Sequence, residues 1–309
     1  MTTTTGLLPH FARLCEMARA LPTAPVAVVS PEEPNALGGA LMAAELDLIT
    51  PILIGDAAKM QAAAGELGKT LDGFEIIDEP SHAAAPKRAV EMVHEGKATV
   101  IMKGHLHTDQ LLRPIFTSNG GLRTGRQISH VFVMDIPGFD RMLTITDAAI
   151  NIAPDLKVKV DIAQNAIHLQ KALGVEAPKV AVVSAVETVN PAMPTTLEAA
   201  ALAKMADRGQ IKGGFVDGPF AMDNALNEAA AATKGITSPV AGKADIILAP
   251  NMEAGNMMVK LLTFAAGAQT AGLVLGAKCP VILTSRADDA NSRVASVAAA
   301  ALYAKALAS

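Results

Sequence analysis

The chain has 309 residues, of which 50% are hydrophobic and only 3% aromatic, and its formal net charge is −4 at pH 7. This length exceeds the size at which one hydrophobic core usually stops growing, which favours two domains. The negative charge argues against nucleic acid as the main partner, because nucleic-acid-binding domains normally carry a basic surface.

The sequence carries no sign of secretion or membrane insertion. Charged residues interrupt the apolar segment 7–21, so it lacks the uncharged core of a signal peptide. The apolar stretch 261–283 contains Gln269, Lys278 and Pro280, which divide it into helix, loop and strand. The two cysteines, Cys15 and Cys279, belong to no paired metal motif, and we expect buried free thiols. These features predict a soluble, cytoplasmic protein.

Short apolar runs alternate with helical patterns through the first 116 residues. We predict strands at 25–30, 52–55, 74–77 and 99–102 and helices at 11–18, 35–46, 57–67, 85–94 and 108–116. Asp56 is the expected N-cap of the third helix. Such alternation specifies a mostly parallel sheet with helices on both faces.

A turn-rich loop at 118–121 marks a candidate domain boundary, and the runs 130–136 and 142–146 around Pro137-Gly138 predict a β-hairpin. Alternation then resumes, with Thr195 and Glu198 as a candidate capping box. The apolar runs near 272 and 281 and the Ala-rich final helix return to the first sheet. We therefore predict an α/β fold of two mostly parallel domains, the first comprising 1–127 and 271–309 and the second 128–270.

Polar residues follow two of the later strands. Asn251, Glu253 and Asn256 come after the strand 246–249, where a helix begins, and Thr284, Ser285 and Arg286 follow the strand 281–283. Ligands of open α/β sheets bind at the carboxyl ends of strands, near helix N-termini. A guanidinium beside a hydroxyl at this edge favours a phosphate or carboxylate ligand.

Four further candidates follow earlier strands. Lys103 ends one strand and Arg113 lies on the next helix, so either is an anion contact or an ordinary solvated cation. Asp147 and Asn151 follow the hairpin, where they are walls of a crevice or simple helix caps.

Two motifs favour less specific interpretations. The segment 120–125 resembles a phosphate loop but lacks the Lys-Ser/Thr ending, so it is either a turn-rich connector or a loop that presents Arg123 and Arg126. His105, His107 and Asp109 alternate after a strand, but no other His or Cys cluster supplies further ligands. We expect loop histidines near a pocket and no metal site.

A set of ordered motifs resembles the phosphate acetyl/butyryltransferase family over nearly the whole chain, and is closest to its phosphate butyryltransferase branch. They include Gly121-Leu-Arg-Thr-Gly-Arg126, Ile136-Pro-Gly-Phe-Asp-Arg141, the segment 146–155, Ala185-Val-Glu-Thr-Val-Asn-Pro191, the segment 205–213, Ser238-Pro-Val-Ala-Gly242, Asn251-Met-Glu-Ala-Gly-Asn256 and Leu283-Thr-Ser-Arg-Ala-Asp288.

The resemblance implies a two-domain α/β fold with a cleft between the domains. It implies the reaction of a short-chain acyl-CoA, butyryl or acetyl, with phosphate to give acyl phosphate and CoA, by direct transfer in a ternary complex. No cofactor is implied beyond CoA as a substrate, and we expect a homodimer or larger homo-oligomer. By position, Ser285 and Arg286 match the family's reacting Ser-Arg pair, and Arg113 matches an upstream cleft arginine.

The chain departs from the family at one position. Acetyltransferase members have an aspartate six residues after the reacting arginine, proposed as a base for the thiol, whereas this chain has Ser292. Asp288 and Asp289 lie nearby and are the candidate substitutes. Two alternatives stay open: a non-catalytic acyl-CoA-binding protein, and a metal-dependent decarboxylating dehydrogenase of similar architecture. The second needs a carboxylate cluster and a nucleotide site, and the sequence assembles neither convincingly.

Overall fold

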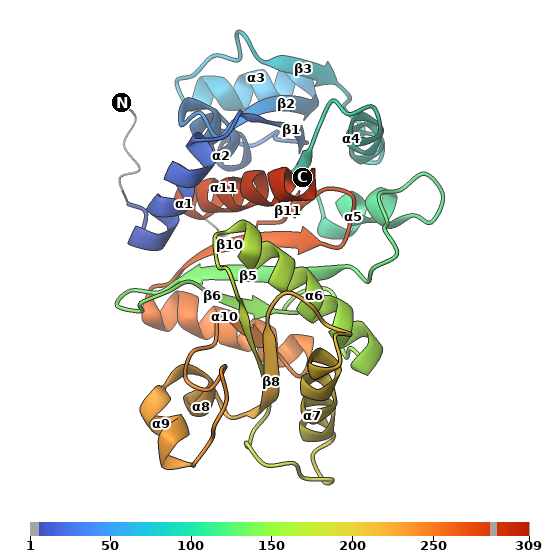
Figure 1. Cartoon of the computed structure of the whole chain (residues 1–309). Helices are drawn as coiled ribbons and strands as arrows, with labels where there is room; N and C mark the ends of the chain where they lie inside the picture. The colour runs from blue at the N-terminus through green and yellow to red at the C-terminus, as the bar shows by residue number, and fades with distance from the viewer. Residues whose placement is uncertain (1–5, 285–288, 309) are drawn as a thin grey trace. The chain divides into compact units, whose positions relative to one another are not determined.

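The computed structural model describes residues 6–284 and 289–308. The chain forms two compact units, residues 1–126 with 269–309, and residues 127–268. Both are α/β units with mostly parallel strands, which confirms the predicted fold class (Figure 1).

The first unit alternates strands and helices as the sequence predicts. Its strand order is β3-β2-β1-β4-β11-β10, and all neighbouring pairs are parallel except β10 with β11. The elements up to residue 116 are α1 (Pro9–Arg19), β1 (Ala24–Val29), α2 (Pro34–Glu45), β2 (Ile49–Gly55), α3 (Ala57–Glu66), β3 (Glu75–Asp78), α4 (Ala85–His94), β4 (Val100–Lys103) and α5 (Thr108–Phe116).

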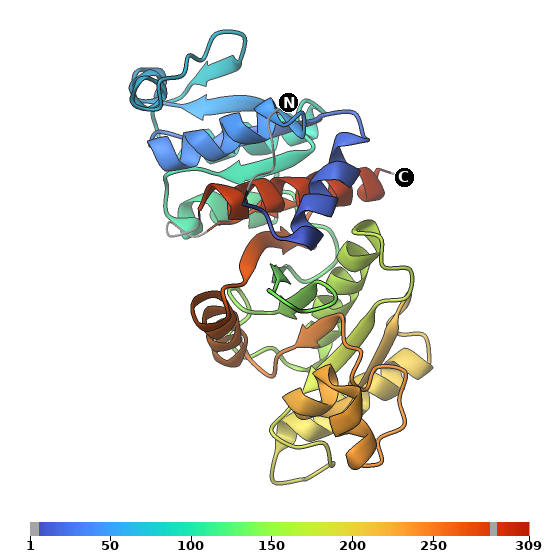
Figure 2. The same cartoon turned by 90° about the vertical axis from the view of Figure 1, so that its left-hand side faces the viewer.

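The C-terminal segment completes this unit with β10 (Gln269–Leu275), β11 (Val281–Ile282) and α11 (Ala290–Leu307). β11 lies parallel to β4, with Val281 opposite Ile101. α11 lies against α1 and α2 (Figures 1 and 2). Every residue of α11 from Ser292 to Tyr303 is buried, because its many alanines let neighbouring elements approach on all sides.

The second unit begins with the predicted hairpin. β5 (Ser129–Asp135) and β6 (Leu143–Thr146) are antiparallel, with Val131 opposite Thr146. The strand order is β5-β6-β9-β7-β8, and the later pairs are parallel. The other elements are α6 (Leu156–Ala172), β7 (Lys179–Val183), α7 (Pro194–Asp207), β8 (Phe215–Phe220), α8 (Met222–Leu226), α9 (Glu228–Thr233), β9 (Ile246–Leu248) and α10 (Met252–Ala266).

Of the helix caps predicted at Asp56 and at Thr195, the first is confirmed and the second is wrong. Asp56 caps α3 by accepting a hydrogen bond from the Lys59 amide at 3.1 Å. The capping box at Thr195 does not form, because α7 already begins at Pro194. The Thr195 hydroxyl instead lies 2.8 Å from the Ser184 hydroxyl, and Glu198 pairs with the buried Lys159 ammonium of α6. Contacts with distant elements therefore replace the local cap.

Both cysteines are buried free thiols, as predicted. Burial raises the pKa of Cys15 to about 11 and that of Cys279 to about 12. The apolar stretch 261–283 is divided into the end of α10, β10 and β11. Within the described ranges, no helix combines the length and apolarity that crossing a bilayer requires.

Candidate functional site

The predicted polar residues of the second unit gather where β6 and β9 end. These strands are parallel neighbours, with Thr146 opposite Leu248, so both chains leave the sheet at the same edge. The Ala249 amide donates to the Thr146 carbonyl at 2.8 Å and the Met252 amide donates to the Ile152 carbonyl at 3.0 Å. The loop after β6 and the start of α10 are therefore fastened to each other.

Asp147 organises the loop after β6 with both of its carboxylate oxygens. One oxygen accepts the amides of Ala149 and Ile150 at 2.8 and 2.9 Å. The other accepts the His130 amide at 3.1 Å, and from Asn151 both the amide at 3.3 Å and Nδ2 at 2.6 Å. The side chain is buried, and these five bonds fill its acceptor capacity of about four lone-pair sites. Asp147 thus holds the shape of the strand-end loop.

Asn151 extends this network toward β5. Its Nδ2 also donates to the Ile128 carbonyl at 2.8 Å, and its Oδ1 accepts from Gln127 Nε2 at 3.0 Å. Asn165 on α6 then donates to the Gln127 carbonyl at 3.0 Å and to the Ser129 hydroxyl at 2.9 Å. The amide side chains therefore hold the loop to β5 and α6.

The three candidates on α10 have different surroundings. Asn251 is the N-cap and accepts the Ala254 amide at 2.9 Å, while Asn256 Nδ2 donates to the Ala148 carbonyl at 3.1 Å. Gly255 lets the helix approach closely, since a Cβ there would lie 2.6 Å from the Asp147 carbonyl oxygen. Glu253 lies exposed in the first turn. The structure thus brings Asp147, Asn151, Asn251 and Asn256 together, with Glu253 available to solvent beside them.

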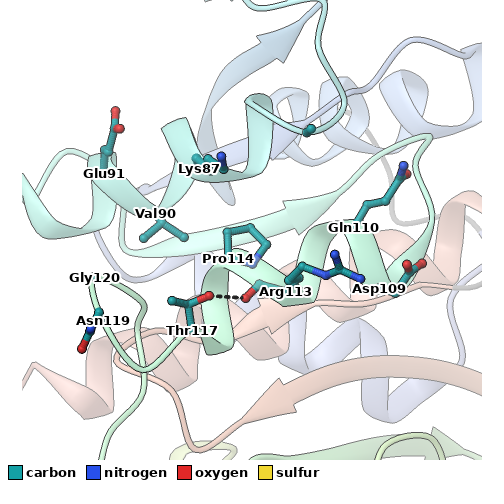
Figure 3. Close-up of a pocket in the computed structure, with 11 residues that line it drawn as sticks. Lys87, Val90, Glu91, Asp109, Gln110, Arg113, Pro114, Thr117, Asn119 and Gly120 are labelled. Carbon is teal, nitrogen blue, oxygen red and sulfur yellow. Dashed lines mark hydrogen bonds between the residues drawn. The ribbon is translucent and has the colours of Figure 1, made fainter.

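Arg113 lines a pocket of about 680 Å³ in the first unit. α4 contributes Lys87 and Glu91, and α5 contributes Asp109, Gln110 and Arg113 (Figure 3). Its volume falls in the range of small-molecule sites, roughly 300–1,000 Å³. Both signs of charge are present, and the two cations can bind an anionic group.

The loop after α5 builds one wall of this pocket. The Thr117 hydroxyl donates to the Arg113 carbonyl at 3.0 Å, closing the end of the helix (Figure 3). His94 Nε2 lies 3.2 Å from the Gly120 carbonyl oxygen, which connects α4 to the loop. Gly121 has no room for a side chain, because a Cβ would lie 2.3 Å from the Thr117 carbonyl oxygen.

The segment 120–125 is a connector in the structure. The Lys278 amide donates to the Leu122 carbonyl at 2.8 Å, and the Thr124 hydroxyl donates to the Gly276 carbonyl at 2.7 Å. Arg123 and Arg126 are both exposed. These two hydrogen bonds fasten the segment to the chain before β11, as expected of a connector.

Lys103 ends β4 as a buried side chain beside a second, smaller cavity of about 30 Å³. Arg293 of α11, also buried, lines the same cavity and donates from Nη1 to the Thr284 hydroxyl at 2.8 Å. His105, also at its lining, pairs through Nδ1 with Glu33 at 2.8 Å. Two buried cations from distant segments therefore converge on one cavity.

The catalytic candidates at the C-terminal end are described only in part. Ser285, Arg286 and Asp288 lie outside the described residues. Asp289 is the N-cap of α11 and accepts the Ser292 amide at 2.8 Å. In the residues that the structure describes, no group of three or more His, Cys, Asp and Glu side chains is placed to hold a metal ion.

Sequence reasoning missed Lys87 and Arg293. Lys87 sits on a helix with an ordinary amphipathic pattern, which gave no signal. Arg293 did leave one, since a lone arginine within an Ala-rich apolar helix must either reach the surface or find a buried partner.

Comparison with known proteins identifies the family of this chain. A family model described as phosphate acetyl/butaryl transferase matches residues 81–301. The chain is 55% identical to a phosphate acetyltransferase of Rhizobium meliloti over 95% of this chain and 93% of the relative. It is 49% identical to a phosphate butyryltransferase of Clostridium acetobutylicum over 82% and 84% of the two chains. A crystal structure of a branched-chain phosphotransacylase from Enterococcus faecalis V583 superposes with a TM-score of 0.80 at 29% identity, covering 91% of this chain and 99% of that one.

Proposed function

Because this chain belongs to the phosphate acetyl/butaryl transferase family, we propose that it transfers a short acyl group between CoA and inorganic phosphate. The match over residues 81–301 is the observation that carries the proposal, since it spans both units. It agrees with the family resemblance of the ordered motifs.

In this reaction an oxygen of phosphate attacks the thioester carbonyl carbon. The carbon–sulfur bond then breaks, the acyl phosphate forms, and CoA leaves as a thiolate that takes up a proton. Phosphate is already a nucleophile, so the enzyme gains most by aligning it and by stabilising the carbonyl oxygen as it becomes negative. We assign these tasks to Ser285 and Arg286, and assign Asp288 or Asp289 to the thiol proton.

The 680 Å³ pocket beside Arg113 supports a binding role for that residue. Lys87 and Arg113 offer positive charge to the phosphate groups of CoA. We propose two kinds of role for the predicted substrate contacts Asp147, Asn151, Asn251, Glu253 and Asn256. Glu253 is accessible for direct contact, whereas the others act by positioning the loop after β6.

Release of CoA from acyl-CoA on addition of phosphate tests the function directly. We expect turnover that requires both acyl-CoA and phosphate, and that forms one acyl phosphate for each CoA released. Binding of acyl-CoA without any CoA release would instead favour the non-catalytic alternative.

The acyl group is tested by the same assay across chain lengths. The relatives include both acetyl- and butyryltransferases, and we propose that a three- to four-carbon group is accepted. Each buried methylene contributes up to about 0.8 kcal/mol. Butyryl-CoA should then match or exceed acetyl-CoA in kcat/KM. A strong preference for acetyl-CoA would contradict the proposed three- to four-carbon acyl group.

Arg286 is the sharpest single test of the reacting pair. A planar guanidinium can hold two phosphate oxygens and leave a third free to attack, whereas lysine offers one point contact. We expect Arg286→Ala to lower kcat/KM by at least about a hundredfold, roughly 2.7 kcal/mol, and Arg286→Lys not to restore it. Unchanged kinetics in a folded Arg286→Ala protein would remove the residue from the site.

The proton acceptor is tested with Asp288→Asn, Asp289→Asn and the double variant. Loss of a general base should slow the CoA-consuming direction by roughly 10²–10⁴-fold. Asparagine retains capping ability at position 289, so α11 should stay intact. Wild-type rates in all three variants would exclude a base at these positions.

We further propose a homodimer or larger homo-oligomer. Met257, Leu261 and Phe264 lie on one face of α10 and are 65%, 65% and 75% exposed. Such an apolar stripe is typical of a protein contact. Light scattering at micromolar concentration should give a multiple of the chain mass, and Leu261→Lys should lower it. A monomer in the wild type would contradict this.

A further inference from the structure

Glu32 is a buried carboxylate that contacts the segments after three neighbouring strands. It follows β1, and its side chain is only 4% exposed. Its Oε1 accepts the Asp56 amide at 3.1 Å, at the start of α3 after β2. Its Oε2 lies 2.8 Å from Nε2 of His82, in the turn after β3, and 3.9 Å from Lys59 Nζ. Because β1, β2 and β3 are parallel neighbours, Glu32 joins the segments that leave one edge of the sheet.

The contact with His82 ties the entry of α4 to this edge. An ionised carboxylate only accepts hydrogen bonds, so His82 donates from Nε2. A bond to a charged acceptor is roughly twice as strong as a neutral one. The turn itself is closed locally, since the amides of Ala84 and Ala85 both donate to the Ser81 carbonyl at 2.9 Å. Ala84 is the N-cap of α4 and offers no capping side chain. The bond between His82 and Glu32 therefore adds what the local turn lacks, a fixed position against the sheet.

α4 builds one wall of the 680 Å³ pocket. Ala83, directly after His82, lines this pocket, and Lys87 lines it one helical turn further on (Figure 3). A shift of the turn before α4 would thus move the Lys87 ammonium relative to Arg113, which lines the same pocket from α5.

Building on the proposed acyl transfer, in which this pocket binds the phosphate groups of CoA, we propose that His82 is a positioning residue for CoA binding. Its bond to Glu32 holds the start of α4, and so keeps Lys87 in place opposite Arg113. His82 is not among the described residues that line the pocket, so it acts through α4. Loss of the bond should weaken CoA binding and leave the chemical step unchanged.

Three variants separate this positioning role from general support of the fold. His82→Leu removes the donor, whereas His82→Gln keeps an N–H group that can donate to the carboxylate. Lys59→Met is the matched control. It removes another cation that contacts Glu32, but from α3, which contributes no residue to the described lining of the pocket.

Two measurements are made on each variant. Calorimetry gives the affinity for CoA alone, which needs no turnover, and the CoA-release assay gives kcat and separate KM values for acyl-CoA and phosphate. We expect His82→Leu to weaken CoA binding and to raise the acyl-CoA KM by at least about fivefold, as for loss of a hydrogen bond to a charged group. Its kcat and phosphate KM should stay within about twofold of wild type. His82→Gln and Lys59→Met should bind CoA as the wild type does.

Circular dichroism checks that each variant folds, which we expect because the His82 side chain is 34% exposed. If His82→Leu does not fold, His82→Ala replaces it. Wild-type CoA affinity and acyl-CoA KM in the folded variant would overturn the proposal. An equal loss of affinity in Lys59→Met would also overturn it, since that would indicate a general effect of removing a partner of Glu32. So would a failure of His82→Gln to retain binding.

Failure of the proposed function looks different in these experiments. The wild type would then bind CoA but release none from acyl-CoA when phosphate is added. In that event the CoA affinities of the variants still decide the role of His82. A wild type that does not bind CoA would contradict both proposals.

Discussion

At Asp147, one carboxylate satisfies four backbone amides and one side-chain amide. Asparagine has only one acceptor oxygen where aspartate has two. In either orientation of the side chain, its NH₂ group would therefore face at least two N–H donors. Each unsatisfied buried donor costs about 1–3 kcal/mol. We expect Asp147→Asn to lower the free energy of unfolding by at least about 2 kcal/mol, measured by urea denaturation.

Asp155 provides the control for this substitution. It is an exposed N-cap of α6 that accepts the Val158 amide at 2.8 Å, and asparagine caps helices about as well as aspartate. Asp155→Asn should change stability by less than about 0.5 kcal/mol. Equal stability of the two variants would show that the Asp147 network contributes little.

Asp245 should make stability depend on pH in a defined direction. Burial raises the pKa of this carboxyl above its ordinary value of 3.8, despite its hydrogen bond from the Lys179 amide at 2.9 Å. Because the pKa of Asp245 is higher in the native than in the unfolded state, its contribution to the free energy of unfolding is fully present below the unfolded pKa. That contribution is lost as pH rises through the native pKa.

Asp245→Asn keeps an acceptor for the Lys179 amide and removes the titration. The stability of the variant relative to wild type should therefore increase as pH rises above about 4, and level off once Asp245 is ionised. Urea denaturation from pH 4 to pH 8 measures this difference. A difference that stays flat or falls with pH would contradict the prediction.

At the scale of elements, α2 and α11 pack closely where Gly39 meets Arg293. A Cβ at Gly39 would lie 2.5 Å from Arg293 Cδ. Gly39→Ala must therefore displace a buried arginine stem, and we expect a loss of about 1–3 kcal/mol in thermal or urea unfolding.

Gly65 offers the opposite case within a helix. A Cβ there would have no described heavy atom within 4 Å, and the residue lies inside α3. Gly65→Ala should increase stability by about 0.5–1 kcal/mol through helix propensity alone. If both alanine variants changed stability in the same direction, packing against Arg293 would not be the cause.

At the scale of the whole molecule, α11 brings the C-terminal end of the chain back into the first unit. It packs against β10, which precedes it closely in the chain, and against α1 and α2, which lie far away in sequence. A chain that ends at residue 289 should lose cooperative unfolding of this unit, seen as a lower urea midpoint and faster proteolysis. Removing only the last two residues should have no effect, since Ala308 is exposed. An unchanged midpoint after removal of the helix would show that α11 is dispensable.

The sequence alone determined the α/β class, the hairpin at Pro137-Gly138 and the cap at Asp56, because apolar periodicity and turn chemistry are local. It also determined the family, since the ordered motifs are directly legible. The tertiary structure alone decided which polar groups are partners. It brought Arg293 and Lys103 to the lining of one cavity and turned Asp147 toward its own loop. In place of the predicted cap at Thr195, it paired Glu198 with Lys159. Burial and pairing depend on elements distant in the chain, which no local pattern specifies.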